Sequence, residues 1–203
     1  MTIRKGEAWG ESAPLPADGV LVRSDAEARA IVTEARLSGH DAPTLGLLGG
    51  DLCRTLGGLG DEGRLRSAEA MTFPCDLGVA ELDGVRHWFV AHAIARRSWW
   101  RGRTVAAMNA QWLGSWDLGP RSHPNDGLLD VTDGTLPLGD RWKARRRLPT
   151  GTHVPHPALR VTRAALVDLL LDPPLDVWLD GVKLGRVRHL SLSIEPDALR
   201  IVV

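Results

Sequence analysis

The sequence is poor in cysteine and in every aromatic residue except tryptophan. Its 203 residues include two cysteines, Cys53 and Cys75, no tyrosine, two phenylalanines and eight tryptophans. Two cysteines cannot build a disulfide framework, and their spacing is not that of a metal site. We therefore expect two buried, unpaired thiols and assign no metal ligand.

An excess charge of one sign and long apolar runs are also missing. Twenty-five basic residues balance twenty-five acidic ones, so no overall field draws the protein to nucleic acid. No apolar run reaches the roughly 18 residues of a membrane span. The first residues lack the apolar middle of a signal peptide. We expect a cytoplasmic protein whose contact with a membrane, if it has one, is peripheral.

The first sixty residues favour a short α/β unit behind an N-terminal tail or strap at residues 1–19. Ser24–Glu27 forms a capping box, and the apolar residues after it recur at helical spacing until Gly39. Residues 44–48 predict a buried strand, and Asp51 is placed to cap a short helix at 52–56. We interpret residues 20–60 as a truncated α/β remnant.

The rest of the chain favours β structure. Residues 60–70 look like an exposed link, and short apolar runs separated by Gly, Pro or Asp follow from residue 71. The predicted strands are 75–81, 86–94, 103–112, 128–132, 158–166, 175–179, 189–194 and 199–203. The expected fold class is α+β and predominantly β, with a sandwich or half-open barrel over residues 71–203.

Five motifs stand in one order along residues 40–203. They are Leu47-Leu-Gly-Gly-Asp-Leu-Cys-Arg-Thr-Leu-Gly57, Cys75-Asp-Leu-Gly-Val79, Met108-Asn-Ala with Asp126-Gly-Leu-Leu-Asp-Val131, Val177-Trp-Leu-Asp-Gly181, and Glu195-Pro-Asp-Ala-Leu-Arg-Ile-Val-Val. Their order resembles the diacylglycerol kinase and sphingosine kinase-type lipid kinases, which belong to the NAD kinase/diacylglycerol kinase-like superfamily.

The resemblance implies a β-sandwich-like C-terminal lipid-kinase domain, ATP and Mg²⁺ as cofactors, and a lipid as phosphoryl acceptor. Two departures stand out. The chain has no Gly-Gly-Asp-Gly-Thr loop, since Leu52 and Cys53 follow Gly49-Gly50-Asp51, and Val182 replaces the Glu of Asp-Gly-Glu. The nucleotide-binding half is therefore expected to be missing or truncated.

Asp126 is the candidate catalytic residue. The resemblance implies that the Asp of the Asp-Gly-x-Leu-Asp run accepts the proton of the acceptor hydroxyl, a task for which a carboxylate needs an aligning hydrogen bond. The alternative is that Asn125-Asp126-Gly127 is simply a turn, because all three residue types are common in turns.

Three histidines form a second candidate set. His123, His153 and His156 lie in Pro-containing segments, and together with Asp126 they offer ligands for a metal or a phosphate. A metal-dependent hydrolase is the weaker functional alternative that follows. Loop histidines that bond to the backbone are the simpler interpretation.

Arginine and tryptophan alternate in two segments, 96–103 and 141–147. Guanidinium groups pair with phosphate and stack on Trp, so we predict a role in ligand or phosphate binding for Arg96, Arg97, Arg101 and Arg121. A charged, solvated sheet edge is the alternative. The Gly49-Gly50-Asp51 turn can also meet a phosphate through its amides, although Asp51 as a helix cap is simpler.

Two further hypotheses concern the whole protein. It binds a lipid or a small phosphorylated ligand and phosphorylates it only with a separate nucleotide-binding partner, or it is a non-catalytic binding or regulatory module of the same fold. A homodimer is the other expected partner, because a lost domain exposes a sheet edge.

Overall fold

The computed structural model describes residues 9–203, and 44% of the chain is strand against 18% helix. The predominantly β, α+β fold class is therefore confirmed. The N-terminal elements are β1 (Glu11–Ser12), β2 (Val20–Val22), α1 (Asp25–Leu37), β3 (Leu45–Leu47), α2 (Asp51–Thr55) and α3 (Glu62–Leu65). None of the helices in this described range is long and apolar enough to cross a membrane.

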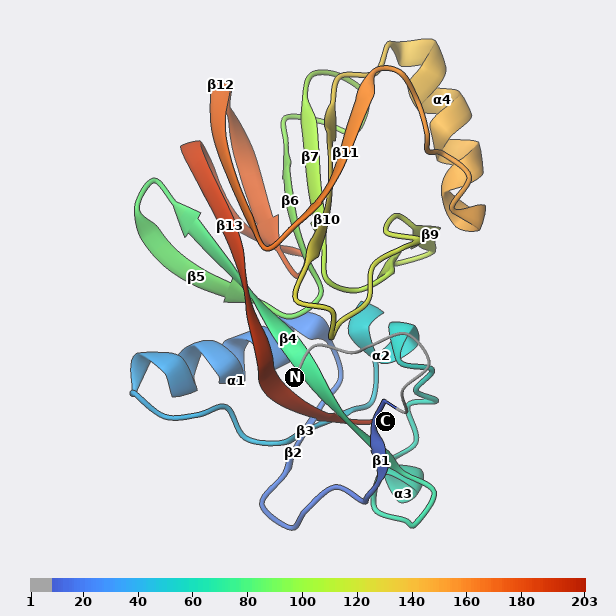
Figure 1. Cartoon of the computed structure of the whole chain (residues 1–203), viewed down its shortest axis with the longest axis vertical. Helices are drawn as coiled ribbons and strands as arrows, with labels where there is room; N and C mark the ends of the chain where they lie inside the picture. Colours follow the sequence, from blue (N-terminus) through green and yellow to red (C-terminus); the bar gives the residue numbers. More distant parts are fainter. Residues whose placement is uncertain (1–8) are drawn as a thin grey trace.

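The remaining elements form a large antiparallel assembly with one helix on its side (Figure 1). They are β4 (Met71–Leu82), β5 (Val85–Phe89), β6 (His92–Arg96), β7 (Thr104–Met108), β8 (Trp112–Leu113), β9 (Trp116–Asp117), β10 (Leu129–Gly134), α4 (Leu138–Arg147), the 3₁₀ turn η1 (Leu148–Thr150), β11 (Leu159–Ala164), β12 (Leu166–Leu179) and β13 (Val182–Val202).

One sheet of eleven strands runs through the molecule. Its main path has the order β1-β4-β13-β12-β6-β7-β10-β11, while β5 pairs with β4, and β2 and β3 attach through a parallel contact of β3 with β13. The predicted strands 189–194 and 199–203 are one strand, β13, with a register shift opposite β4 between Glu195 and Leu199. β13 thus joins the α/β elements to the antiparallel strands.

The predicted first helix is confirmed. Ser24 caps α1 by accepting the Glu27 amide, and the Glu27 carboxylate reaches back to the amide of Arg23. This exchange satisfies helix-end donors that would otherwise lack partners. The helix ends at Leu37 with Ser38 as its C-cap, and Gly39 follows with a φ of +74°, a conformation that glycine adopts without strain.

Three local predictions need correction. Asp51 is the first residue of α2 rather than its cap, because Asp25 binds the helix-end amides and the cap position is Gly50. The link at 60–70 contains α3, whose Leu65 is buried. The basic segment 141–147 lies in helix α4 and not at a sheet edge. Of the first predicted segment, residues 1–8 lie outside the described range.

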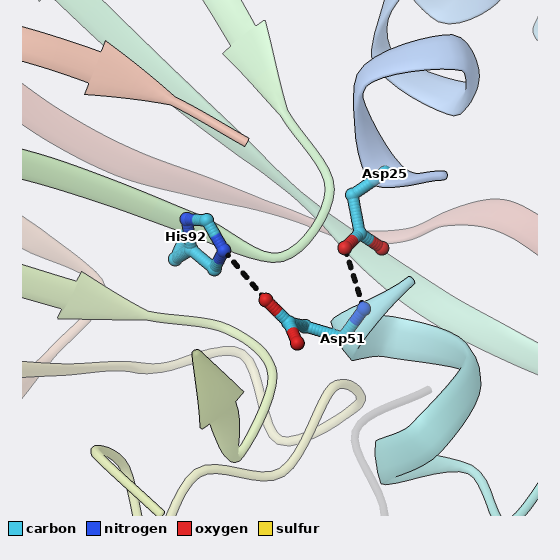
Figure 2. Close-up of side chains that lie close together, drawn as sticks. All are labelled: Asp25, Asp51 and His92. Carbon is cyan, nitrogen blue, oxygen red and sulfur yellow. Dashed lines mark hydrogen bonds and ion pairs between the residues drawn. The ribbon is translucent and has the colours of Figure 1, made fainter. Parts of the chain in front are cut away.

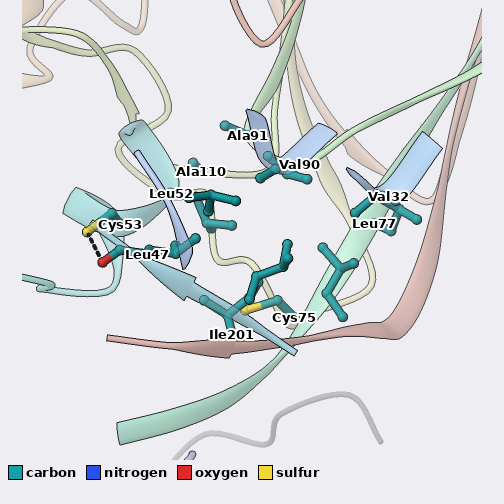
Figure 3. Close-up of a cluster of buried hydrophobic side chains, with 14 of the residues drawn as sticks. Val32, Leu47, Leu52, Cys53, Cys75, Leu77, Val90, Ala91, Ala110 and Ile201 are labelled. Atoms are coloured by element: carbon teal, nitrogen blue, oxygen red, sulfur yellow. Dashed lines mark hydrogen bonds between the residues drawn. The ribbon is translucent and has the colours of Figure 1, made fainter. Parts of the chain in front are cut away.

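The N-terminal core packs α1, α2 and β3 against β4 and β13. Figure 3 shows this cluster, in which Leu52 comes from α2, Cys75 and Leu77 from β4, Val90 from the turn after β5, and Ile201 from β13. Both cysteines are buried and unpaired as predicted. A second core fills the space between β4, β12, β13 and the β6–β7–β10 strands. Because the two cores share β4 and β13, the turns that meet between them are held from both sides.

Candidate functional site

Three turns meet where the two cores adjoin, and they bring Asp25, Asp51 and His92 together (Figure 2). Asp25 opens α1 after β2, and Asp51 opens α2 after β3. Because β2 and β3 are adjacent parallel strands, the residues after their carboxyl ends lie side by side. His92 begins β6 and reaches Asp51 with Nε2 3.0 Å from Oδ2.

The Asp25 carboxylate caps α2. Its oxygens accept the amides of Asp51 at 2.6 Å and Leu52 at 3.1 Å, two of the donors that a helix N-terminus leaves open. Gly50 makes room for this contact, since a Cβ there would lie 2.6 Å from Asp25 Oδ1, and its φ is +100°. Burial and the charge of Asp180 raise the pKa of Asp25 to about 6, against the effect of the two amides.

Asp180 holds the turn that carries His92. This carboxylate is buried and accepts the amides of Val90 at 2.8 Å, Ala91 at 2.9 Å and His92 at 3.0 Å. It explains why the predicted strand 86–94 is broken into β5 and β6. Burial acts against charge on His92, but the hydrogen bond to Asp51 and the nearby carboxylates of Asp180, Asp51 and Asp25 outweigh it and raise its pKa.

Sequence reasoning missed this centre. The spacing of Asp25 and Asp51 after two short strands was the available signal, but β2 was not predicted. The contact of Asp51 with His92 joins residues 41 positions apart, so no local sequence pattern predicts it. Two carboxylates and one imidazole suit a transition ion better than Mg²⁺, which prefers oxygen ligands. The protein's own donors already occupy both carboxylates, because Asp51 also accepts the amide of Gly114 at 2.8 Å.

An open cleft extends from His92 and has a volume of about 510 Å³. Arg96 lies in it with its guanidinium carbon 4.0 Å from the ring centre of Trp178 and 4.6 Å from that of Trp99. The Nε of Arg96 is buried without an acceptor in the described residues. Arg145 also lines the cleft, 5.3 Å from the ring centre of Trp116. Burial lowers the pKa of Arg96, while the charge of Asp176 raises it.

An apolar cavity of about 90 Å³ adjoins the cleft and shares Trp99, Trp116 and Arg145 with it. Helix α4 and the strands β7 and β10 supply seven of its fifteen lining residues. His153 lines it and is only 5% exposed, yet neither ring nitrogen has a partner in the described residues. Burial lowers the pKa of His153, so its ring is neutral near pH 7.

Asp126 lies in a different polar cluster, next to Asp76. Its carboxylate accepts the amide of Leu128 at 3.0 Å and pairs with Arg163. Burial raises the pKa of Asp126 to about 6, against the effect of Arg163. Asp76 binds the Gly127 amide at 2.7 Å, so the loop is built as a carboxylate-supported turn. The role of Asp126 as a base remains a prediction.

The three predicted histidines have different surroundings. His123 contacts the Trp9 ring at a tilt of 54°, with ring centres 4.4 Å apart. His153 lines the apolar cavity, and His156 Nε2 lies 3.8 Å from Asp140 Oδ2. No three ligand atoms among them and Asp126 lie within 4.8 Å of one another. Within the described residues these four side chains therefore do not form a metal site, and their shared role in ligand binding remains a prediction.

The other predicted ligand residues are distributed unevenly. Of the four arginines, Arg96 lines the cleft, while Arg97, Arg101 and Arg121 are exposed and line neither the cleft nor the cavity. Gly49 packs against the Arg23 carbonyl, where a Cβ would lie at 2.7 Å. The predicted ligand-binding roles of the four arginines and of the Gly49-Gly50-Asp51 turn remain predictions.

A protein family model now connects these observations. The YegS C-terminal NAD kinase beta sandwich-like domain matches residues 69–203. The chain belongs to this family. The resemblance to lipid kinases is thereby confirmed for the C-terminal β domain, and the protein has a lipid kinase-like fold.

Solved structures extend the similarity of fold. One, of a protein from Bacillus anthracis str. Sterne assigned as a diacylglycerol kinase, has a TM-score of 0.68 at 14% identity and covers 91% of this chain and 77% of that one. Another, of a diacylglycerol kinase from the same organism, has a TM-score of 0.62 at 15% identity, with 91% and 75% covered. No curated protein matches the chain.

The kinase-like family implies ATP and Mg²⁺, but the described turns do not fit a nucleotide phosphate. The first two amides of α2 are bound by Asp25, and the Glu27 amide and the Arg23 amide are bound by side chains of the capping box. Carboxylates therefore stand where an anion would need free donors. We derive no phosphoryl transfer within this chain alone.

Proposed function

We propose that this protein binds a phosphorylated lipid with a single chain, holding its phosphate in the cleft and its chain in the adjoining cavity. The observation that carries the proposal is the juxtaposition of a cationic cleft and an apolar cavity that share Trp99, Trp116 and Arg145. An amphiphilic ligand needs two such sites next to each other, one polar and one apolar.

Arg96 and Arg145 are the phosphate ligands in this proposal. Neither forms an ion pair with a carboxylate in the described range, and both are oriented by tryptophan rings. A guanidinium stacked on an aromatic ring keeps its N–H groups free at its edge, where a phosphate oxygen binds in bidentate geometry. The unpartnered Nε of Arg96 is then one of the donors.

The cavity sets the number of chains. A volume of about 90 Å³ holds about six water-sized groups, at roughly 15 Å³ each, so one chain fits and two do not. His153 adds a polar requirement, because a buried imidazole without a partner is costly. An ester carbonyl or a hydroxyl near the head of the chain supplies the missing hydrogen bond.

A second candidate function is lipid phosphorylation with a separately encoded nucleotide-binding domain. The Asp126 carboxylate favours it, since a pKa of about 6 suits a general base near neutral pH. ATP and Mg²⁺ would come with that partner.

Without such a partner, the protein is a non-catalytic binding module. A homodimer can then cover the exposed sheet edge. We place it in the cytoplasm, at the periphery of a membrane that holds its ligand.

The proposal is tested by tryptophan fluorescence, because three tryptophans line the cleft. Decyl phosphate should give a saturable change, while decanol and inorganic phosphate should bind at least tenfold more weakly. Equal affinity for decyl phosphate and decanol would refute the phosphate site. Equal affinity for decyl phosphate and inorganic phosphate would refute the chain site.

Two measurements address phosphorylation. Equilibrium dialysis of the isolated chain with ATP and Mg²⁺ should show no saturable binding, and a saturable site would overturn the proposal of a missing nucleotide half. If a co-purifying nucleotide domain restores phosphoryl transfer, Asp126→Asn should abolish it without unfolding the chain. Unchanged turnover would remove Asp126 from the role of base.

A further inference from the structure

The outer side of α4 combines exposed apolar side chains with arginines. Leu138 is 66% exposed and Trp142 56%. Helical spacing places Arg145 and Arg146 on the same side as these two residues. Trp100, which is 45% exposed, adjoins them because the Arg145 guanidinium carbon lies 5.2 Å from its ring centre. We call Trp100, Leu138, Trp142, Arg145 and Arg146 the α4 patch.

Arg141 makes this patch one rigid surface. Its buried guanidinium donates to the Leu136 carbonyl at 2.7 Å, to the Trp99 carbonyl at 3.2 Å and to the Gly102 carbonyl. These bonds fasten the loop between β6 and β7 to α4, at the outer edge of the molecule (Figure 1). Trp100 and Trp142 are therefore held on neighbouring segments and not on two loops that move independently.

The charge of the patch is uncompensated. Asp140 is the one carboxylate of α4, and it pairs with Lys143 at 3.1 Å and lies near His156. No ion pair within residues 9–203 involves Arg145, Arg146 or the following Arg147. Arg146 lies 4.8 Å from the ring centre of Trp142. The chain as a whole is neutral, so the positive charge is a local feature.

We propose that the α4 patch docks on the surface of an anionic membrane. Tryptophan at the level of the headgroups and arginine paired with lipid phosphates are the usual contacts of proteins that lie on a bilayer. A nucleic acid or an acidic protein satisfies the arginines, but it offers Leu138 no acyl region. The bilayer satisfies both parts of the patch.

Docking in this orientation also places the apolar cavity beside the bilayer. The same helix lines the cavity through Arg141, Ala144 and Arg145, and Arg145 and Trp100 belong both to the α4 patch and to the lining of the cavity. A lipid chain that moves from the bilayer into the cavity then has to pass only α4 and the loop beside it. This last step rests on the proposed lipid-binding function, whereas the docking itself does not.

Co-sedimentation with vesicles tests the docking. The full chain should bind vesicles of phosphatidylcholine mixed with phosphatidylglycerol, and binding should fall with added salt and be far weaker for phosphatidylcholine alone. Arg146→Gln should weaken the binding about fivefold, the effect of one basic residue near an anionic surface. Arg188→Gln, which removes an exposed arginine on β13, is the control and should have little effect.

The apolar half of the patch needs its own variants. Trp142→Ala and Leu138→Ala should each weaken vesicle binding, while Leu37→Ala, at a leucine 75% exposed on α1, should not. If Arg146→Gln acts and Trp142→Ala does not, the partner is a soluble polyanion and the proposal is wrong. Absence of binding to anionic vesicles, or equal loss in the control variants, would also overturn it.

The docking and the proposed function fail separately. Arg96→Gln should lose affinity for decyl phosphate and keep vesicle binding, because Arg96 lies in the cleft and outside the α4 patch. The reverse pattern is expected for Trp142→Ala. A protein that binds vesicles but not decyl phosphate would leave the docking standing and remove the proposed ligand.

Discussion

Two regions contain several charged side chains: the N-terminal centre around Asp25, Asp51 and His92, and the cleft beside α4. They differ in whether groups of the protein itself bind those side chains. At the first, Asp25, Asp51 and Asp180 bind backbone amides of the protein itself, and among these three residues and His92 only the His92 Nδ1 atom is buried without a partner in the described residues. At the second, Arg96 and His153 are left with nitrogens that bind nothing in the described residues. Satisfied polar groups hold a fold, whereas buried polar groups without a partner point to a ligand or to water. The comparison assigns a structural role to the three carboxylates of the first region and a binding role to Arg96 and His153 of the second.

The largest effect that tests this comparison is expected from the removal of Asp180, the carboxylate that accepts three backbone amides. Asp180→Ala leaves three buried amides without an acceptor, so we expect a loss of about 3 kcal/mol or more in the free energy of unfolding. Urea titration measures it, with Asp18→Ala at an exposed position as the control. A loss no larger than that of the control would mean that this region is not structural.

Replacement of the cleft arginine should affect binding and spare stability. Arg96→Gln removes a charge-assisted contact, so the affinity for decyl phosphate should fall about 10- to 100-fold. Arg188→Gln, which changes the net charge equally, should leave the affinity unchanged in the same fluorescence titration. A large loss of folding stability with unchanged affinity would move Arg96 into the structural region.

A third prediction tests whether the unpartnered His153 imidazole binds the ligand where its chain enters the cavity. His153→Leu keeps the cavity filled but removes the hydrogen bond, so the preference for an acyl ester phosphate over an alkyl ether phosphate should fall about fivefold to tenfold. Competition titrations with the two ligands measure this ratio. An unchanged ratio would indicate that water and not the ligand satisfies the imidazole.

The dependence of stability on pH gives the smallest expected signal. The pKa of Asp25 is raised to about 6 in the folded protein from an ordinary value of 3.8, so the folded state binds more protons between these values. The free energy of unfolding contributed by this group therefore falls as pH rises from about 4 to 6, by at most about 1.4 kcal/mol per pH unit. Asp126 acts in the same direction, because burial also raises its pKa to about 6.

Unfolding at several pH values checks this dependence. In Asp126→Asn the free energy of unfolding should decline less steeply between about pH 4 and 6 than in the unaltered protein, because one of the two groups with a raised pKa is gone. An equally steep decline would show that Asp126 titrates at its ordinary value. Asp18→Ala, at an exposed position, should leave the slope unchanged.

Much of the fold was predictable because its signals are local. The capping box at Ser24, the strand at 44–48 and the alternation of short apolar runs after residue 71 each predicted an element that the structure contains. The five motifs gave the family. The helix α4 was missed because its stripe is narrow and its residues are mostly arginine, a composition that also suits a solvated edge.

The candidate site was less predictable because its contacts are distant in sequence. Arg96 was identified from its alternation with tryptophan, but its two ring partners lie at positions 99 and 178. His153 was identified as part of a histidine set that does not converge. The feature that indicates a binding role for His153 is that its ring is buried without hydrogen-bond partners in the described residues, and no sequence pattern predicts this. Asp51 was identified as a cap, while the cap is Asp25, 26 residues earlier.

The 21-residue strand β13 has a consequence for how the protein is made. It pairs with β4, β12 and β3, and its last residues, Ile201 and Val202, hold the parallel contact to β3. During translation, the second core lacks its β13 residues until Leu192 has left the ribosome, and the N-terminal core lacks them until Leu199 and Ile201 have, so unpaired strand edges stay exposed until late in the synthesis of this region. Exposed strand edges of this kind are prone to aggregate, and a premature stop before Val187 would deprive both cores of β13.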